Sequence, residues 1–306
     1  MTAIDLGNRF VKVAHQGQVW AVESIYAHVQ GSGSGAVHYV QGSQSELVGT
    51  SWVVGHQARN HRRGIRTWLS EKHECALRLV LGVLGAEDLE LDLVMSLPDP
   101  GEGDLLQKAL IGEHHILVHG QSVTVVINSV QVQPEGMGIY WYGQQQGLTV
   151  PRTLTGILDL GGGTAIATLV DEQGSQIEGA RVVLRRGGVY GLAGDIAADP
   201  RLTCQVVGTP KIELIMDGIA ERSFAYGVQG VSFAGFFEER CDLWLKGILS
   251  EALNRWDPWL ERIGVILVAG GAAPLAAGWL KRMGEQRWFK VVEDPQFAQV
   301  LGLCGV

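Results

Sequence analysis

The sequence has few cysteines, no long apolar run and no excess of positive charge. Its four cysteines lie far apart and form no Cys-x-x-Cys pair, which argues against a disulfide framework or a zinc site and indicates free thiols in a reducing compartment. No stretch approaches the roughly 20 consecutive apolar residues of a membrane-spanning helix, and the chain starts without a basic-then-apolar signal segment. We therefore expect a cytoplasmic protein without membrane association.

The charge balance and two missing motifs exclude further classes. A net charge of −8 argues against direct binding of nucleic acid through general electrostatics. A local exception is the basic cluster Arg59–Arg66, which indicates either a solvated face or a contact with an acidic partner, another subunit or DNA. Neither a Gly-x-x-x-x-Gly-Lys-[Ser/Thr] motif nor a Gly-x-Gly-x-x-Gly after a strand is present, so P-loop and Rossmann folds lack their signatures.

Length and composition predict two lobes of roughly 150 residues each, with sizeable cores. The chain has 306 residues, of which 46% are apolar and 18% charged. We expect a first lobe over 1–150, with a small inserted subdomain at about 24–88, and a second lobe over 151–306, with a small subdomain at about 200–235. Each lobe is predicted to open with three antiparallel strands, and the third strand of the second lobe is expected at 176–184. Helices are expected at 67–84, 134–146, 190–199, 211–222, 236–262, 273–283 and 295–303.

Two similar short patterns stand at the beginnings of these lobes. The first is Asp5-Leu6-Gly7-Asn8 and the second is Asp159-Leu160-Gly161-Gly162-Gly163-Thr164, each flanked by apolar strands. Both predict a strand, a tight turn and a second strand, with a carboxylate at the end of the first strand. Two such hairpins facing each other can hold the phosphates and the metal ion of a nucleotide from both sides.

The first pattern has the groups that a phosphate requires. Gly7 permits a positive φ, so that successive N–H groups at Gly7 and Asn8 can point toward one phosphate oxygen. Lys12 can reach a β- or γ-phosphate as a point charge, and Asp5 would face Mg²⁺. Because Mg²⁺ dehydrates reluctantly, Asp5 and Asp159 would hold it through water. The alternative is a plain hairpin with an outward lysine.

The second pattern and a later strand add to this prediction. Three glycines, Gly161–Gly163, are unusual in a hairpin unless something approaches the backbone closely, and Thr164 offers a hydroxyl to the same phosphate. The apolar strand 264–269 ends in Gly270-Gly271-Ala272 before a helix, a flat surface for a ribose or adenine. The alternatives are a loose loop and an ordinary strand-to-helix turn.

These motifs resemble those of the actin, sugar-kinase and Hsp70 nucleotide-binding superfamily, and within it the bacterial and archaeal actin-like proteins of the ParM/StbA plasmid-segregation type. Asp5 to Lys12, Asp159 to Thr164 and Val265 to Pro274 correspond to the two phosphate motifs and the adenosine motif. The helix start at Pro134-Glu135-Gly136 and the segment 294–303 strengthen the likeness. Residues 24–88 and 200–235 match by position alone. The resemblance implies an α/β, two-lobed actin-like (ribonuclease H-like) ATPase fold, each lobe a mixed sheet flanked by helices.

The resemblance also implies an activity. Mg-ATP, with GTP as a possible substitute, would bind between the lobes, and Glu135 would orient the water that attacks the γ-phosphate. Lys211 and Glu213 would line the adenine pocket. The protein would polymerise into filaments and hydrolyse ATP for plasmid segregation or another cytoskeletal role, through a DNA-binding adaptor. From the residues alone, Glu135 is equally a helix-dipole partner, and Lys211 with Glu213 a solvated helix face.

Two other functions remain open on the same fold. A small-metabolite kinase would need a catalytic Asp beside a sugar pocket, and no such Asp stands out. A non-polymerising nucleotide-binding scaffold would not need Asp5, Lys12, Glu135 and Asp159 together. Two other features point to structure instead of chemistry: His114-His115 lack ligand partners at metal spacing, and Trp244, Trp256 and Trp259 indicate core or subunit contacts.

Overall fold

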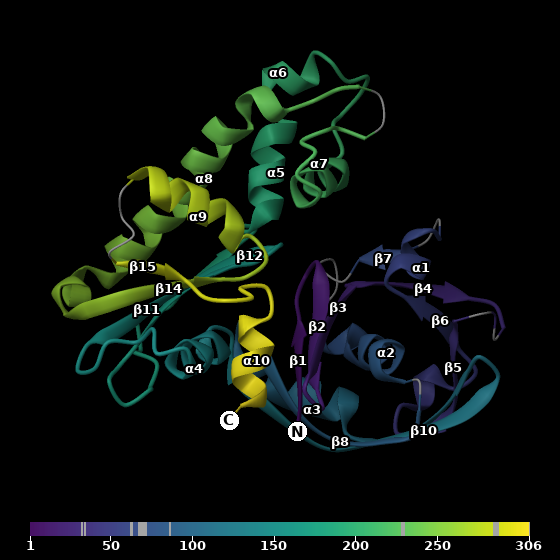
Figure 1. Cartoon of the computed structure of the whole chain (residues 1–306). Helices are drawn as coiled ribbons and strands as arrows, with labels where there is room; N and C mark the ends of the chain where they lie inside the picture. The colour runs from purple at the N-terminus through teal and green to yellow at the C-terminus, as the bar shows by residue number, and fades with distance from the viewer. Residues whose placement is uncertain are drawn as a thin grey trace. The chain divides into compact units, whose positions relative to one another are not determined.

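The computed structural model describes residues 1–31, 33, 35–61, 64–66, 72–85, 87–227, 230–283 and 288–305. The chain folds into two compact units (Figure 1), one formed by Met1–Tyr142 with the C-terminal residues from Gln299, and one by Gly143–Ala298. The boundary between these units falls inside helix α4 (Met137–Gln145). It therefore precedes the lobe boundary predicted after residue 150.

The first unit contains a ten-stranded sheet in the order β3-β2-β1-β8-β10-β9-β5-β6-β4-β7. Strands β3, β2 and β1 are antiparallel, whereas β1, β8 and β10 are parallel. All residues of β1 are buried, as expected for a strand covered on both faces. The strands are β1 (Thr2–Leu6), β2 (Phe10–His15), β3 (Gln18–Glu23), β4 (Ile25–Val29), β5 (Val37–Gly42), β6 (Ser51–Val54), β7 (Ile65–Arg66), β8 (Leu89–Leu97), β9 (Gly112–Val118) and β10 (Gln121–Pro134).

The sheet of the first unit curves around helices α2 (Lys72–Leu84) and α3 (Gly103–Leu110), as Figure 1 shows. Apolar side chains of α2 share one core with β1 and β8 and with Tyr39 and Trp52. Strands β4 to β7 therefore extend the main sheet. The predicted helix start at 67–71 and the arginines at 62 and 63 lie outside the described residues. The shorter helices are α1 (His56–Arg59), η1 (Ser45–Leu47), η3 (Pro100–Glu102) and, at the C-terminus, α10 (Ala298–Cys304).

The second unit repeats the beginning of the first. Its five-stranded sheet has the order β13-β12-β11-β14-β15, with β13, β12 and β11 antiparallel and β11, β14 and β15 parallel. In the sheet of the first unit, the neighbouring strands β3-β2-β1-β8-β10 follow the same pattern. The predicted three-stranded opening of each lobe is thus confirmed. The strands are β11 (Leu154–Leu160), β12 (Thr164–Val170), β13 (Val182–Arg185), β14 (Ile263–Ala269) and β15 (Phe289–Val291).

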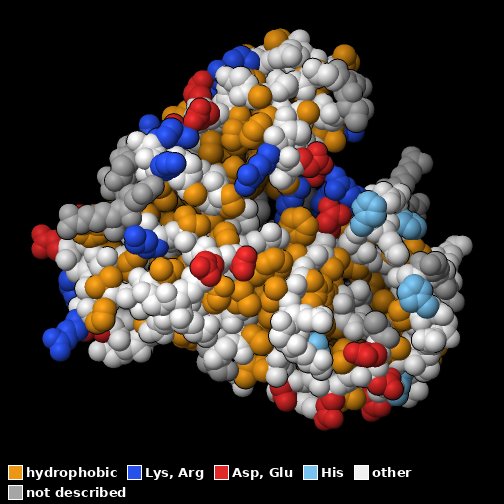
Figure 2. Space-filling view, in the orientation of Figure 1, with side chains coloured by type: hydrophobic (Ala, Val, Ile, Leu, Met, Phe, Trp, Pro, Cys, Tyr) orange, Lys and Arg blue, Asp and Glu red, His pale blue; other side chains and the backbone are white. Residues whose placement is uncertain are grey.

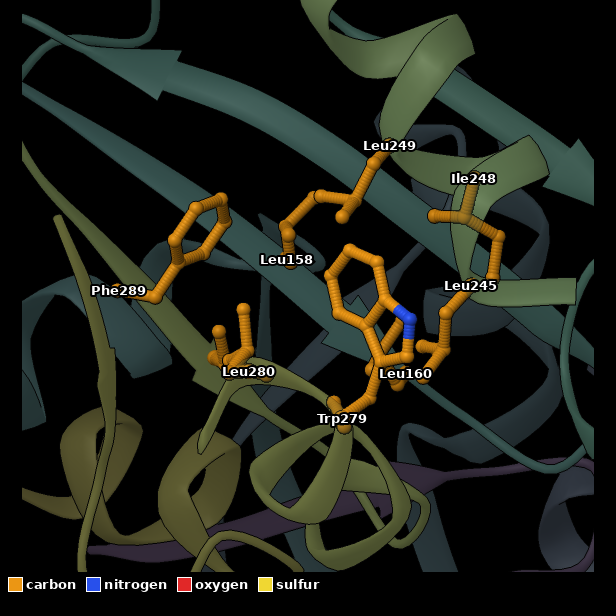
Figure 3. A pocket seen from close by; sticks show the side chains of 10 residues that line it. Leu158, Leu160, Leu245, Ile248, Leu249, Trp279, Leu280 and Phe289 are labelled. Carbon is orange, nitrogen blue, oxygen red and sulfur yellow. The ribbon is translucent and has the colours of Figure 1, made fainter. Parts of the chain in front are cut away.

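Long helices cover one face of this second sheet. Leu158, Leu160 and Val268 of the sheet pack against Trp244 and Trp279 of α8 and α9 in one apolar core. Figure 3 shows an apolar recess where α8 and α9 meet the sheet, lined among others by Leu249, Leu280 and Phe289. The helices are α5 (Val189–Ala197), α6 (Pro200–Thr203), α7 (Ile212–Ala220), α8 (Ala234–Trp256), η4 (Asp257–Arg262) and α9 (Ala273–Met283).

Three predicted elements end or begin at other residues. The strand expected at 176–184 is reduced to β13, because Gly179 turns the chain with a φ of +80°. The α-helix expected over 236–262 ends at Trp256 and continues as 3₁₀ helix, since Pro258 has no N–H for an α-helical bond. The last helix begins at Ala298 because Asp294 adopts a φ of +41° in the preceding turn.

The acidic net charge of the sequence is visible on the surface of the first unit (Figure 2). On the face in Figure 2, Asp and Glu side chains gather along the lower edge of the first unit. Within the described residues, no helix combines the length and the apolar character that a membrane crossing requires.

The contact between α4 and α10 gives a stability prediction. A Cβ atom at Gly302 would overlap the backbone carbonyl of Gly138, whereas a Cβ at Gly247, exposed in the middle of α8, would meet open space. We expect Gly302→Ala to destabilise the protein by about 1–3 kcal/mol through overpacking, and Gly247→Ala to stabilise it by about 0.5–1 kcal/mol. Thermal unfolding of both variants tests this. Equal shifts of the melting temperature would contradict the described helix contact.

Candidate functional site

The first turn places a buried carboxylate beside an amine. Asp5 lies in β1 directly opposite Lys12 in β2, and opposite residues of antiparallel strands project to the same face. Lys12 Nζ donates to Asp5 Oδ2 over 2.6 Å, and the two side chains are 13% and 8% exposed. The structure therefore brings together the two charged residues predicted for the first turn, in a largely desolvated ion pair.

Close approach, and not a left-handed backbone, explains Gly7. The positive φ predicted there is wrong, since its φ lies outside the left-handed region. A Cβ atom at Gly7 would lie 2.6 Å from the carbonyl oxygen of Phe10, closer than side chains tolerate. Within the described part of the chain, the N–H groups of Gly7 and Asn8 donate to no backbone carbonyl. These two groups are therefore available to an anion.

Two distant side chains fix this turn, and neither stands out in the sequence. Ser24 Oγ donates to the carbonyl of Gly7, and Lys72 Nζ, from the first turn of α2, donates to the carbonyl of Leu6. Lys72 also lies near the buried thiol of Cys75, whose pKa burial raises to about 11. Lys72 thus ties α2 to the end of β1. Its only sequence signal is a lysine at a helix start.

Ser96 extends the polar row from β1 across β8 to β10. It lies opposite Asp5 on one side and opposite Gln133 on the other. Its side chain is 1% exposed, and its Oγ has no hydrogen-bond partner among the described residues. A buried hydroxyl without a partner costs free energy unless water or a ligand satisfies it. This position therefore indicates a polar ligand or an ordered water beside Asp5.

Glu135 lies between β10 and α4 and precedes the helix that it was predicted to open. Its N–H donates to the carbonyl of Leu97 over 2.9 Å, and its side chain is 7% exposed. The next residue, Gly136, has a φ of +102° and donates its N–H to Gln299 Oε1 over 3.1 Å. The end of the strand and this glycine together hold a buried carboxylate at the same edge of the sheet as Ser96.

The carbonyl groups of the second turn are occupied by helix α5. Val189 N donates to Gly161 O over 3.1 Å and Tyr190 N to Gly162 O over 2.8 Å, while Gly188 N lies 3.4 Å from Gly163 O. Within the described residues, the N–H groups of Gly162 and Gly163 have no backbone acceptor. The turn therefore has its acceptors satisfied and two donors left over, the arrangement that an anion-binding turn needs.

Gly188, which precedes α5, packs directly against the backbone of this turn and must therefore be glycine. A Cβ atom at Gly188 would lie 2.5 Å from Gly161 O and 2.8 Å from Thr164 N. The sequence predicted a close approach to the backbone of Gly161–Gly163, and the start of α5 makes such an approach. Gly188 was not identified from the sequence because a glycine before a helix is common.

The diglycine after β14 joins the second turn. Gly270 has a φ of +89°, and a Cβ there would lie 2.5 Å from Asp159 Oδ1. Ala272 N donates to Leu160 O over 2.9 Å. Gly271 is exposed, with open space where a Cβ would stand. The structure thus brings Asp159, the glycine turn and the diglycine surface together within the second unit.

Lys211 and Glu213, which were predicted to line an adenine pocket, have few contacts that would fix their side chains. Both are exposed at the start of α7, and Lys211 N donates to Tyr226 Oη over 2.9 Å. Their side chains form no hydrogen bond or ion pair with any described residue. No contact in the described chain links them to Gly270 or Asp159, so their role stays a prediction.

The paired histidines belong to the structure of the first unit. His114 is fully buried, with Nδ1 2.8 Å from Tyr39 Oη and Nε2 2.8 Å from Leu110 O. Because a carbonyl only accepts, Nε2 carries the proton and Nδ1 accepts from the tyrosine. Burial lowers the pKa of His114 and keeps the ring neutral. Among the described residues, no group of three or more His, Cys, Asp and Glu side chains could hold a metal ion.

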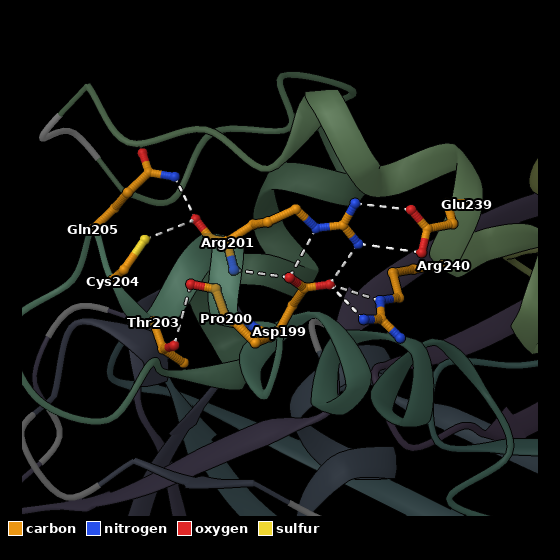
Figure 4. A network of polar contacts seen from close by, with 8 residues as sticks. All are labelled: Asp199, Pro200, Arg201, Thr203, Cys204, Gln205, Glu239 and Arg240. Atoms are coloured by element: carbon orange, nitrogen blue, oxygen red, sulfur yellow. Dashed lines mark hydrogen bonds and ion pairs between the residues drawn. The ribbon is translucent and has the colours of Figure 1, made fainter.

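Asp199 is the centre of a charged network in the second unit (Figure 4), on elements other than the turns. Its side chain is 1% exposed and accepts from Arg201 N over 2.9 Å at the start of α6. Asp199 Oδ2 lies 2.8 Å from Arg201 Nη2 and 2.6 Å from Arg240 Nη2. Arg201 also pairs with Glu239. The network joins α6 to α8 and thereby stabilises the unit.

This network predicts a dependence of stability on pH. Hydrogen bonds from Arg201, with the charge of Arg240, hold the pKa of Asp199 well below its usual range. A lowered pKa in the folded state gives stability that is present above the unfolded value of about 3.9 and is lost as pH falls below it. We expect Asp199→Asn to lower the melting temperature at neutral pH, and the difference from the unchanged protein to shrink below pH about 4. A constant difference down to strongly acidic pH would contradict this assignment.

Comparison with solved structures defines the class of fold. The archaeal actin homologue Ta0583 in complex with ADP has a TM-score of 0.79 at 15% identity, over 99% of this chain and 97% of that chain. A ParM from a 15-stranded filament of Clostridium botulinum gives 0.77 at 17%, over 99% and 97%. Bacillus thuringiensis ParM with ATP gives 0.70 at 15%, over 100% and 97%. This chain therefore has the actin-like fold, with mixed sheets flanked by helices.

A family model supports the same conclusion from the sequence. Residues 3–138 match the family described as actin-like proteins N-terminal domain. No curated protein sequence matches the chain. The resemblance to actin-like proteins predicted from the phosphate and adenosine motifs is confirmed.

Proposed function

We propose that this chain is an actin-like ATPase that binds Mg-ATP, assembles into filaments and hydrolyses the nucleotide. The observation that carries the proposal is the pair of turns after β1 and β11. Each follows a strand that ends with an aspartate and a leucine, and each leaves two N–H groups without a backbone acceptor among the described residues. A phosphate chain supplies the acceptors that both turns need.

The residues of the first unit would divide the chemistry among them. Hydrolysis breaks the bond between the γ-phosphorus and its bridging oxygen, and water supplies the new oxygen. Glu135 would orient this water and accept its proton, while Lys12 would neutralise charge on the phosphate oxygens. Ser96 Oγ is buried beside Asp5 and has no hydrogen-bond partner in the described part of the chain, and it would hydrogen-bond to a water in the same row.

We propose that Asp5 and Asp159 would each hold a hydrated Mg²⁺ through its water ligands. Each stands at the end of a strand beside a turn, and no described cluster could hold a metal ion by itself. Mg²⁺ keeps several water ligands and binds through one or two carboxylates and the phosphates of its substrate. When bound, it would neutralise the charge of the β- and γ-phosphates. Asp5 and Asp159 would orient its water ligands.

Filament formation and DNA partition are the further parts of the proposal. A structural neighbour is a ParM in a filament, and head-to-tail contacts that do not close generate filaments by geometry. The acidic net charge favours a DNA-binding adaptor protein over direct contact with DNA.

Calorimetric titration with Mg-ATP, Mg-GTP and ATP without metal tests nucleotide binding directly. We expect saturable binding of Mg-ATP, and weaker binding when the metal is removed with a chelator. Phosphate release should proceed without any added acceptor. Release that requires a sugar or another small acceptor would support a kinase instead, and the absence of nucleotide binding would contradict the proposal altogether.

A further inference from the structure

Two consecutive arginines form the centre of the turn between β13 and α5. Gly187 N donates to Leu184 O over 2.8 Å, so Arg185 and Arg186 are the two middle residues of a four-residue turn. Arg186 has a φ of +63°, a region that favours glycine or asparagine. Residues that keep an unfavourable backbone conformation cluster at functional sites, which makes this turn a candidate for one.

The turn is held firmly on both sides. Trp244 Nε1, from α8, donates to Gly187 O over 2.7 Å. Leu184 packs against the core of the unit, and Gly188 packs directly on the glycine turn. Contacts with the core and with the second turn together therefore fix the position of the Arg185 backbone.

The register of β12 and β13 places Arg185 beside the second turn. Arg185 in β13 lies directly opposite Thr164 in β12, and opposite residues project to the same face with Cβ atoms about 5 Å apart. Thr164 follows Gly162 and Gly163, whose N–H groups have no backbone acceptor in the described chain. An arginine side chain is long enough to bridge this separation.

Arg185 and Arg186 differ in their partners from three arginines of the α6, α8 and α9 region of the same unit. Arg201, Arg240 and Arg282 each pair with a carboxylate. Arg185 and Arg186 are exposed, and their guanidinium groups form no ion pair or hydrogen bond with any described residue. The chain has 32 acidic residues and only 24 lysines and arginines, so carboxylates that could pair with Arg185 and Arg186 are not scarce.

We propose that Arg185 binds the phosphate chain of the nucleotide at the second turn. The inference rests on the proposed function and deepens it, because it adds a cation to the turn that Gly162, Gly163 and Thr164 form. A guanidinium group matches two phosphate oxygens at once. Arg186 shares the charge and the turn but not the register opposite Thr164, and it therefore serves as the matched control.

Calorimetric titration of the full chain with Mg-ATP, repeated over a series of KCl concentrations, tests the proposal. We expect Arg185→Ala to weaken ATP binding about 10- to 100-fold, the effect of losing a charge-assisted hydrogen bond. The salt dependence should become shallower, because one ionic contact is lost. Arg185→Lys should recover part of the affinity as a point charge. Arg186→Gly, with the same change of net charge, should stay within about threefold of the unchanged protein.

Each outcome decides between the two proposals. If the unchanged protein binds no ATP, the proposed function fails and this inference fails with it. If it binds ATP and Arg185→Ala binds equally well, the inference is wrong and the proposed function stands. An equal loss in Arg186→Gly, or a loss in Arg185→Ala with unchanged salt dependence, would also overturn the assignment to Arg185. Thermal unfolding of each variant shows whether the fold is kept, and Arg185→Lys replaces Arg185→Ala if it is not.

Discussion

Replacing Glu135 with glutamine should slow ATP hydrolysis by about 100- to 10,000-fold, the usual contribution of a positioned general base. Glutamine keeps the size and the hydrogen-bonding capacity of the side chain but cannot accept the proton of the attacking water. Glu135 is buried and its backbone is fixed by Leu97 and Gly136, so a water beside it would be held in one place. The affinity for ATP should change little, because the carboxylate is not assigned to nucleotide binding.

The measurement is phosphate release at saturating ATP, with calorimetric titration for affinity. Glu178→Gln is the control, since Glu178 is exposed and has no partner among the described residues. It should hydrolyse ATP at the rate of the unchanged protein. Unchanged turnover in Glu135→Gln would remove Glu135 from the mechanism, whereas a parallel loss of ATP affinity would assign it to binding.

Replacing Lys12 with methionine should weaken ATP binding by about 10- to 100-fold, through loss of a charge-assisted contact with the phosphates. The change also leaves the Asp5 side chain, 8% exposed, without its cation, and a buried unpaired charge is costly. We therefore expect a lower melting temperature as well. Lys12→Arg keeps the charge and separates the two effects, because it should retain the fold while altering the fit to the phosphates.

Lys246→Met is the matched control for this second prediction. Lys246 is exposed in α8 and has no partner among the described residues. Calorimetric titration with Mg-ATP should give an unchanged affinity for this variant. An affinity of Lys12→Met equal to that of the control would show that Lys12 serves the ion pair with Asp5 alone.

Local patterns were sufficient to predict the strand-turn-strand elements on which the candidate site residues lie. Asp5 and Lys12 belong to one hairpin, whose register is set by a short turn, and their pairing follows from the alternation of strand side chains. The glycine run at 161–163 and the buried strand before Gly270 likewise carry local signals. The strands and turns that carry these residues lie where the sequence predicts them, because few residues separate the groups that meet.

The remaining parts depend on contacts between distant residues. Lys72 and Ser24 fix the first turn from other elements, and Ser96 joins the polar row through a parallel strand pair. Strands β4 to β7 extend the main sheet through the pairing of β5 with β9. Such pairings between distant strands leave no periodicity or motif in the sequence from which they could be predicted. Gly7 is a further example of a contact that the local sequence does not reveal. Position 7 requires glycine because of the nearby carbonyl of Phe10 and not because of its own φ.

One paired measurement tests the central claim that the two turns bind ATP for hydrolysis and assembly. Light scattering and phosphate release are followed together after Mg-ATP is added to the full chain. We expect scattering to rise on addition and to fall as phosphate accumulates, and the fall to be delayed in Glu135→Gln. Phosphate release that appears only with an added acceptor, with no rise in scattering at any protein concentration, would contradict the account.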